Sequence, residues 1–202
     1  VDFDEPSTWV GSTVPPSGSS IDIIQAKLNL NVDNLTLGTV NVGGGSSNFI
    51  LNANTLTITD FINVVGTLNA GTSTIVFDST VADNNSGQRT CAGTSSITLY
   101  DVQVPDNAVV DFGSGDIGAE PNTETTVTGT LSLDGGAVVL FAPFYGAGAT
   151  LKYNDSYTVS TEWTANETSA STKGVPTHVE VATGASLSFG SSSDNYTCAG
   201  NL

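Results

Sequence analysis

The chain has 202 residues, of which four are Lys or Arg and twenty are Asp or Glu, so its formal net charge is −16. This balance excludes nucleic acid and anionic membrane surfaces as partners, because too few cations are present to neutralise phosphates. Only 12% of the residues are charged, so the surface is expected to consist largely of Ser, Thr, Asn and Gly. The length fits one domain or two small ones.

The first 20 residues are predicted to form an N-terminal cap segment. Phe3 and Trp9 are its apolar anchors, and Pro6, Pro15 and Pro16 disfavour regular strand pairing. We expect Trp9 to plug the open end of the core. A role in stacking against a ligand is the alternative for this residue.

Short strands are predicted from Ile21 onward, separated by Asn, Gly and Ser, which favour turns. They cover residues 21–24, 27–30, 35–37, 40–42, 49–51, 56–59, 62–65 and 73–77. In the stretch from Thr55 to Asp78, Gly66–Thr67 and Asn69–Thr72 are predicted to be turns. Apolar and small polar residues alternate within the runs, as half-buried strands require, and no window shows a helical period. The sequence therefore predicts an all-β fold without helices.

The spacing of the strands indicates how they are arranged. One strand recurs every 6 to 8 residues or so, and about 20 residues hold three strands, which is typical of one turn of a solenoid and too close for a sandwich. Further strands are predicted at 97–100, 102–104, 109–112, 127–133, 137–141, 151–153, 179–181 and 187–189. We expect a β-solenoid array over residues 21–202, interrupted by irregular loops near 79–94, 113–122 and 154–176.

Thr90-Cys91-Ala92-Gly93 recurs as Thr197-Cys198-Ala199-Gly200, and we expect the two cysteines to occupy equivalent positions in the array. At about 20 residues per turn they would lie roughly 25 Å apart, beyond the reach of a disulfide in a straight array. Buried free thiols are therefore expected, with pairing to another copy of the chain, or an array that is not straight, as the alternatives. The sequence stops at Leu202 where a further strand should begin, so either the chain continues or another copy completes that edge.

Several stretches resemble one group of bacterial proteins. Ser7-Thr8-Trp9-Val10-Gly11, followed by Val14–Gly18 and Ile21–Ile23, resembles the opening of repeat-rich surface proteins of the Bacteroidetes. Gly66–Asp78 is similar to their solenoid repeat, as are Leu151–Asn154, Glu162-Trp163 and Val175–Val181. The resemblance implies a right-handed parallel β-helix in a large secreted, adhesin-like protein, often exported by type IX secretion.

A catalytic site is not expected. His178 is the only histidine, predicted to face outward from a strand, and no Ser–His–Asp, Cys–His or metal-ligand spacing occurs. The four cations are scattered and the carboxylates are dispersed, so a polysaccharide lyase or hydrolase is a secondary alternative only. Asp2, Asp4 and Glu5 and the run Asp83–Asn85 offer oxygen ligands for Ca²⁺ but match no known calcium loop. We expect solvated acidic loops, with Ca²⁺ as the one cofactor candidate.

Glycosylation is a candidate modification. Asn-x-Ser/Thr sequons occur at Asn34, Asn84, Asn154, Asn166 and Asn195. Asp78-Ser79-Thr80 is similar to the O-glycosylation motif of the Bacteroidetes, which makes Ser79 a further candidate.

The expected function is structural rather than enzymatic. Met is absent and the sequence begins at Val1, which favours a secreted, cell-surface protein in mature form or a fragment of one. No apolar run approaches about 18 residues, so no membrane insertion is expected. We expect a subunit of a self-assembling filament, joined end to end through Phe3, Trp9 and Leu202, or a module of a large adhesin. A carbohydrate- or ice-binding module, with outward Thr55, Thr57 and Thr59, is the alternative.

Overall fold

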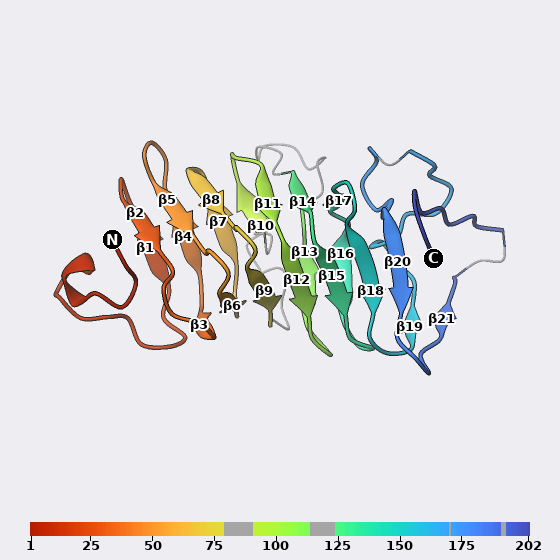
Figure 1. Cartoon of the computed structure of the whole chain (residues 1–202), viewed down its shortest axis with the longest axis horizontal. Helices are drawn as coiled ribbons and strands as arrows, with labels where there is room; N and C mark the ends of the chain where they lie inside the picture. The colour runs from red at the N-terminus through yellow and green to blue at the C-terminus, as the bar shows by residue number, and fades with distance from the viewer. Residues whose placement is uncertain (79–90, 114–123, 170, 191–192) are drawn as a thin grey trace.

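The fold consists of short β-strands stacked along the long axis of the molecule (Figure 1). The computed structural model describes all residues except 79–90, 114–123, 170 and 191–192. Every strand pairing among the described residues is parallel. This part of the chain has no α-helix, and its one helical element is a short 3₁₀ turn. The predicted all-β class is confirmed, and the described residues contain no α-helix, as expected.

The elements have the following bounds: η1 (Pro6–Thr8), β1 (Ile21–Ile23), β2 (Lys27–Asn29), β3 (Leu35–Leu37), β4 (Val40–Val42), β5 (Asn48–Ile50), β6 (Thr55–Ile58), β7 (Ile62–Val64), β8 (Thr67–Asn69), β9 (Thr74–Phe77), β10 (Cys91–Gly93), β11 (Ile97–Leu99), β12 (Asp101–Val104), β13 (Val109–Asp111), β14 (Thr125–Val127), β15 (Thr130–Leu133), β16 (Val138–Phe141), β17 (Phe144–Tyr145), β18 (Thr150–Tyr153), β19 (Tyr157–Thr158), β20 (His178–Val181) and β21 (Leu187–Ser188).

Consecutive strands join different sheets, and the chain usually returns to the same sheet three strands later. A seven-stranded parallel sheet with the order β3-β6-β9-β12-β15-β18-β20 runs through the molecule. The other strands form shorter parallel sheets: β1-β4-β7-β10, β2-β5-β8, β11-β14-β17, β13-β16 and β19-β21. This pattern is consistent with a parallel β-helix. Between β18 and β20 the described residues form β19 and an irregular segment, where the excursion over 154–176 was expected.

The register of the seven-stranded sheet aligns apolar side chains into a continuous inward row. Leu56 pairs with Ile75, Ile75 with Val102, Val102 with Leu131, and Leu131 with Leu151. All five side chains are fully buried. Because side chains alternate between the two faces of a strand, one apolar residue at every second position is enough to build this core. The alternation in the sequence thus specifies which face of each strand points inward.

Residues 1–20 cover the N-terminal end of the stack. Asp2 forms a parallel bridge with Asn29 at the outer edge of β2, and Phe3 beside it is buried. The indole N–H of Trp9 donates to the carbonyl of Phe3 at 2.8 Å, and the two rings meet edge to face with centroids 5.1 Å apart. The first three residues thus pair with the array, which the prolines of this segment had not led us to expect.

A second part of the N-terminal segment covers the outer edge of β3. The backbone N–H of Gly18 donates to the carbonyl of Thr36, and the N–H of Gly38 donates to the carbonyl of Ser19. These bonds satisfy polar groups that would otherwise lie on an open strand edge. Two strands of the first turn, β2 and β3, are therefore bonded at their outer edges by residues of the N-terminal segment.

Two local predictions were wrong. Thr67 and Asn69, expected to be turn residues, lie in β8, because the backbone of Thr67–Asn69 pairs in register with Asn48–Ile50. The two Thr-Cys-Ala-Gly copies are not equivalent. The first supplies β10, which pairs with β7, whereas the second forms no strand and lies beside the residues that precede β20. Of the two predicted loops at 79–94 and 113–122, residues 79–90 and 114–122 lie outside the described part of the chain.

Candidate functional site

The outer face of the seven-stranded sheet carries two rows of mostly polar side chains. Strand pairing aligns one residue from each strand, so each row runs along the axis of the stack at about 4.8 Å per strand. The first row contains Thr36, Thr57, Val76, Gln103, Ser132, Lys152 and Glu180. The second contains Thr55, Thr74 and Asp101, followed by Thr130, Thr150 and His178.

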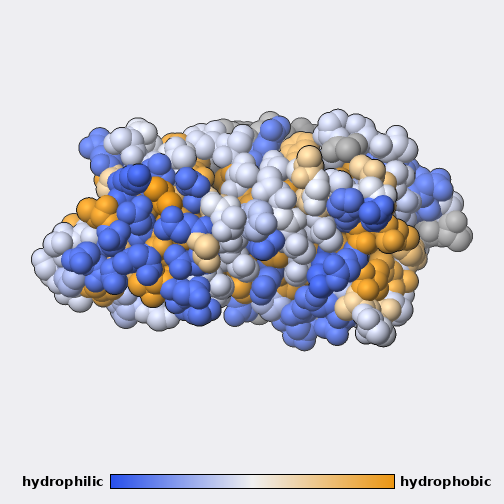
Figure 2. All heavy atoms as spheres, viewed as in Figure 1, coloured by the Kyte–Doolittle hydropathy of each residue, from blue (hydrophilic) through white to orange (hydrophobic). Residues whose placement is uncertain are grey.

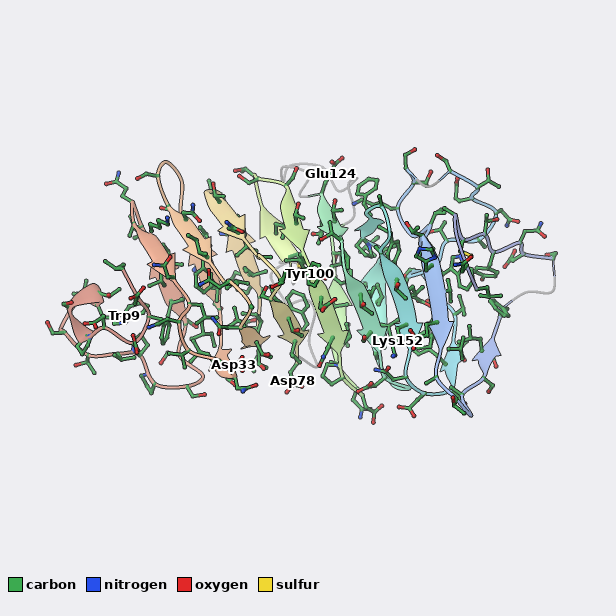
Figure 3. All side chains as sticks on the ribbon, viewed as in Figure 1. Trp9, Asp33, Asp78, Tyr100, Glu124 and Lys152 are labelled. Carbon is green, nitrogen blue, oxygen red and sulfur yellow. The ribbon has the colours of Figure 1, made fainter. Side chains whose placement is uncertain are left out.

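A shallow groove of about 400 Å³ lies on this face over β12, β15, β18 and β20. Its lining is almost entirely polar and includes Asp101, Gln103, Thr130, Ser132, Thr150 and Lys152. Lys152 projects from β18, within the part of the sheet nearer the C-terminus (Figure 3). The groove is a candidate for a polar binding surface, distinct from a mainly apolar pocket of about 490 Å³ lined by Leu140, Phe141 and Ala142.

Charged side chains at the two sides of the groove are fixed by contacts within the protein. The ammonium of Lys152 lies 2.7 Å from the carboxylate of Glu180 on the neighbouring strand. One carboxylate oxygen of Asp101 accepts a hydrogen bond from the backbone N–H of Thr130 at 2.7 Å. By contrast, within the described residues the side chains of Gln103 and Ser132 make no hydrogen bond to the protein. Donors and acceptors at the centre of the groove therefore face solvent.

A second polar cluster is buried beneath the irregular segment that follows β19. The carboxylate of Glu162 is fully buried, and it accepts hydrogen bonds from the hydroxyl of Tyr153 at 3.0 Å and from the backbone N–H of Ser160 at 3.0 and 3.1 Å. The hydroxyl of Tyr145 donates to the backbone carbonyl of Glu162 at 2.9 Å. The hydroxyl of Tyr157 donates to the carbonyl of Ala137. The bonds to Tyr145 and Tyr153 tie the segment around Glu162 to β17 and β18, and the Tyr157 bond ties β19 to the residue before β16.

Burial sets the protonation behaviour of this cluster. Loss of solvent raises the pKa of the Glu162 carboxyl, although the hydrogen bonds from Ser160 and Tyr153 act in the opposite direction. Burial also raises the pKa of Tyr145 and Tyr153, and the nearby Glu162 carboxylate raises both further. The carboxylate is closed to solutes, so we assign the cluster a role in holding the segment against the core.

The structure places the two cysteines in different surroundings. Both thiols are free. Cys91 is fully buried in β10, and burial raises the pKa of its thiol well above the ordinary range. Cys198 is half-buried near the C-terminal end. The Cys91 thiol therefore cannot form a disulfide with another copy of the folded protein. The Cys198 thiol is partly exposed, so burial does not prevent it from doing so.

The predicted modification sites are spread over the surface. Asn34, Asn166 and Asn195 are exposed, and Asn154 is half-buried because its amide donates to Asp134 at 3.0 Å. Ser79 and Asn84 lie outside the described residues. Asn154 lines the polar groove, whereas Asn34, Asn166 and Asn195 are not among its lining residues.

His178, Asp2 and Asp4 each bond to groups of the protein itself. His178 Nδ1 accepts a hydrogen bond from the backbone N–H of Asn201 at 3.0 Å. Asp2 and Asp4 each accept a hydrogen bond from a neighbouring asparagine amide, Asn29 and Asn31 respectively. No group of three or more His, Cys, Asp or Glu residues suited to a metal ion occurs among the residues that the structure describes, and Asp83–Asn85 lie outside them. A search of the same residues finds no helix long and apolar enough to cross a membrane.

The two ends of the stack differ in their cover. Phe3 is 1% exposed under Trp9 at the N-terminal end. At the C-terminal end, Val181 is 37% and Phe189 47% exposed, and Leu202 is 86% exposed. Figure 2 shows apolar residues gathered around β20 at this end. The C-terminal end also carries added backbone, because the N–H groups of Ala199 and Gly200 donate to the carbonyls of Pro176 and Thr177, and the N–H of Val179 donates to the carbonyl of Asn201. Sequence reasoning placed Phe3, Trp9 and Leu202 at the ends but could not show how each end is covered.

Sequence reasoning did not identify the groove or the Glu162 cluster. Both combine residues from separate strands, and their alignment depends on the register. The Tyr and Glu residues within 145–162 were the one signal for the buried cluster that could have been found. No family model, curated protein or solved structure matches the chain. The resemblance to surface proteins of the Bacteroidetes therefore stays a prediction.

Proposed function

We propose that the chain is a structural module of an extracellular surface protein, built as a right-handed parallel β-helix with three strands per turn. The observation that carries this proposal is the seven-stranded parallel sheet with its continuous, fully buried inward row. Right-handed winding is the strongly preferred hand of connections between parallel strands. Stacked turns that each contact only their neighbours form a quasi-one-dimensional array, the architecture of an extended spacer.

The surface supports an extracellular location. Few residues are charged, the net charge is −16, and the outward rows are rich in Thr. Such a surface keeps the protein soluble and repels nucleic acid and anionic lipid. The resemblance to secreted adhesin-like proteins of the Bacteroidetes agrees with this location.

The covered N-terminal end favours a module over a filament subunit. Strand addition between copies requires free strand edges on both partners. Here residues 1–3 occupy the edge of β2, and Gly18 and Ser19 occupy that of β3. A second copy would have to displace this cover before it could extend the stack. End-to-end assembly through the more open C-terminal end is the competing proposal.

An ice-binding role receives less support than the spacer. Thr55 and Thr57 point outward from β6, but Thr59 lies beyond the strand and its hydroxyl donates to the carbonyl of Leu37. Along the outward rows, Val76 and Lys152 interrupt the hydroxyl pattern. A regular array of threonines is therefore absent from the described part of this face.

Single-molecule force spectroscopy tests the structural role. The protein is held between handles attached at its two termini and extended at constant speed. A spacer built from stacked turns is expected to resist extension and then to lengthen in several steps, each releasing one or a few turns of about 20 residues. Extension at low force without discrete steps would argue against a load-bearing module. The outward variant Thr57→Ala serves as the control and should leave the trace unchanged.

A further inference from the structure

We propose that the groove over β12, β15, β18 and β20 binds a neutral oligosaccharide. This inference goes beyond the structural role, and either one can fail without the other. Its basis is the juxtaposition of side chains of several chemical types in one concave surface: a carboxylate at Asp101, an amide at Gln103, hydroxyls at Thr130 and Ser132, and an ammonium at Lys152.

The hydrogen-bonding groups of the groove repeat with the strands. Gln103 pairs with Ser132, and Ser132 pairs with Lys152, so these three side chains follow one another at about 4.8 Å along the axis. The hydroxyls of Thr130 and Thr150 form a parallel row two residues away on the same face. A ligand that lies along the axis would meet a donor or acceptor at every strand. An extended chain of hydroxyl-bearing rings has this repeating character.

Charge selects against acidic ligands. The groove contains Asp101 and Glu180 but only one cation, Lys152, and that ammonium is already paired with Glu180 at 2.7 Å. The whole chain carries a net charge of −16. Uronates, sulfated sugars and phosphates would therefore be repelled, whereas an uncharged saccharide would not. An apolar ligand is disfavoured because it would leave the polar groups of the groove without partners.

The lining also sets the expected strength of binding. No aromatic ring lines the groove among the described residues, so a sugar would be held by hydrogen bonds without a stacking surface. Hydrogen bonds exchanged with water contribute about 1 kcal/mol each. Binding with dissociation constants on the order of a millimolar for a single oligosaccharide is therefore expected. Repetition of such modules on one surface would strengthen attachment through multivalency.

Heteronuclear NMR titration tests the proposal at this affinity. The ¹⁵N-labelled protein is titrated with hexasaccharides of the cellulose, mannan, galactan and chitin types, and with oligogalacturonate as the acidic probe. We expect at least one neutral hexasaccharide to shift the backbone amides of β12, β15 and β18, and oligogalacturonate to leave them unshifted.

Variants connect the shifts to the groove. Gln103→Ala and Ser132→Ala are each expected to weaken binding, by about tenfold when combined. Both residues point outward, so circular dichroism and the melting temperature should match the wild type. Thr57→Ala, in the same outward row but outside the groove, should bind like the wild type.

Three results would overturn the proposal. The first is the absence of shifts with every neutral hexasaccharide, and the second is a set of shifts that maps outside the groove. The third is tighter binding of oligogalacturonate than of any neutral probe. None of these results bears on the force measurement, so failure of this inference and failure of the structural role are distinguishable.

Discussion

Replacement of Glu162 by Gln is expected to change how the stability of the C-terminal turns depends on pH. Gln has the same shape, and its carbonyl can accept the hydrogen bonds from the Tyr153 hydroxyl and the Ser160 N–H. It carries no ionisable proton. The comparison of Glu162→Gln with the wild type therefore isolates the free energy of placing a carboxylate in this buried position.

The sign follows from the direction of the shift. Burial places the pKa of Glu162 in the folded protein above its value in the unfolded chain. The folded state then holds the proton more tightly, so its stabilising contribution is fully present below the ordinary Glu pKa and is lost as pH rises through the folded pKa. Each unit of difference corresponds to about 1.4 kcal/mol. Glu162→Gln should thus be similar to the wild type in acid and progressively more stable than it as the pH rises.

Urea unfolding between pH 4 and pH 8 measures this difference. A Trp9→Phe background leaves Trp163, which is 3% exposed and adjacent to Glu162, as the only tryptophan. Glu162→Ala should be less stable than Glu162→Gln by about 2 to 4 kcal/mol, because the Tyr153 hydroxyl and the Ser160 N–H lose their acceptor. Glu180→Gln is the matched control, since its exposed ion pair contributes less than about 1 kcal/mol. A free-energy difference between Glu162→Gln and the wild type that stays constant across this pH range would refute the reasoning.

Three further perturbations test the packing. Leu56→Ala removes a fully buried side chain and should cost about 3 to 4 kcal/mol in urea unfolding, whereas Thr57→Ala beside it should cost less than about 0.5; equal costs would contradict the assignment of the inward face. Trp9→Ala should speed amide hydrogen exchange in β1 and β2 without affecting β18, and uniform exchange rates would show that Trp9 does not cover that end. In the native protein an aqueous disulfide reagent should modify Cys198 far faster than the buried Cys91, and equal rates would contradict the burial of Cys91.

Much of the fold could be predicted because the inward and outward faces of a β-strand appear in the sequence as alternating apolar and polar residues. Thr74-Ile75-Val76-Phe77 has buried residues at every second position, and the structure forms β9 there with Ile75 and Phe77 inside. The prediction failed at Thr67–Asn69, because Leu68 is the only apolar residue of β8 and backbone pairing with β5 rather than side-chain alternation defines that strand.

The candidate sites were harder to predict because they depend on the register. Gln103, Ser132 and Lys152 are separated by 20 or more residues, and only strand pairing aligns them. For the two Cys-Ala-Gly copies, sequence reasoning instead predicted a structural relation that does not exist. Identical sequence suggested equivalent positions, but only the copy at Cys91 forms a strand, which pairs in register with β7, whereas the copy at Cys198 makes isolated backbone bonds to residues 176 and 177.

Small-angle X-ray scattering of the purified protein at high concentration tests the central claim most directly, because one measurement reports both mass and shape. The account predicts a monomer of 20.6 kDa with the pair-distance distribution of an elongated particle. A compact, near-spherical monomer would contradict the stacked architecture. Polymers that grow with concentration would contradict the spacer module and favour a self-assembling filament.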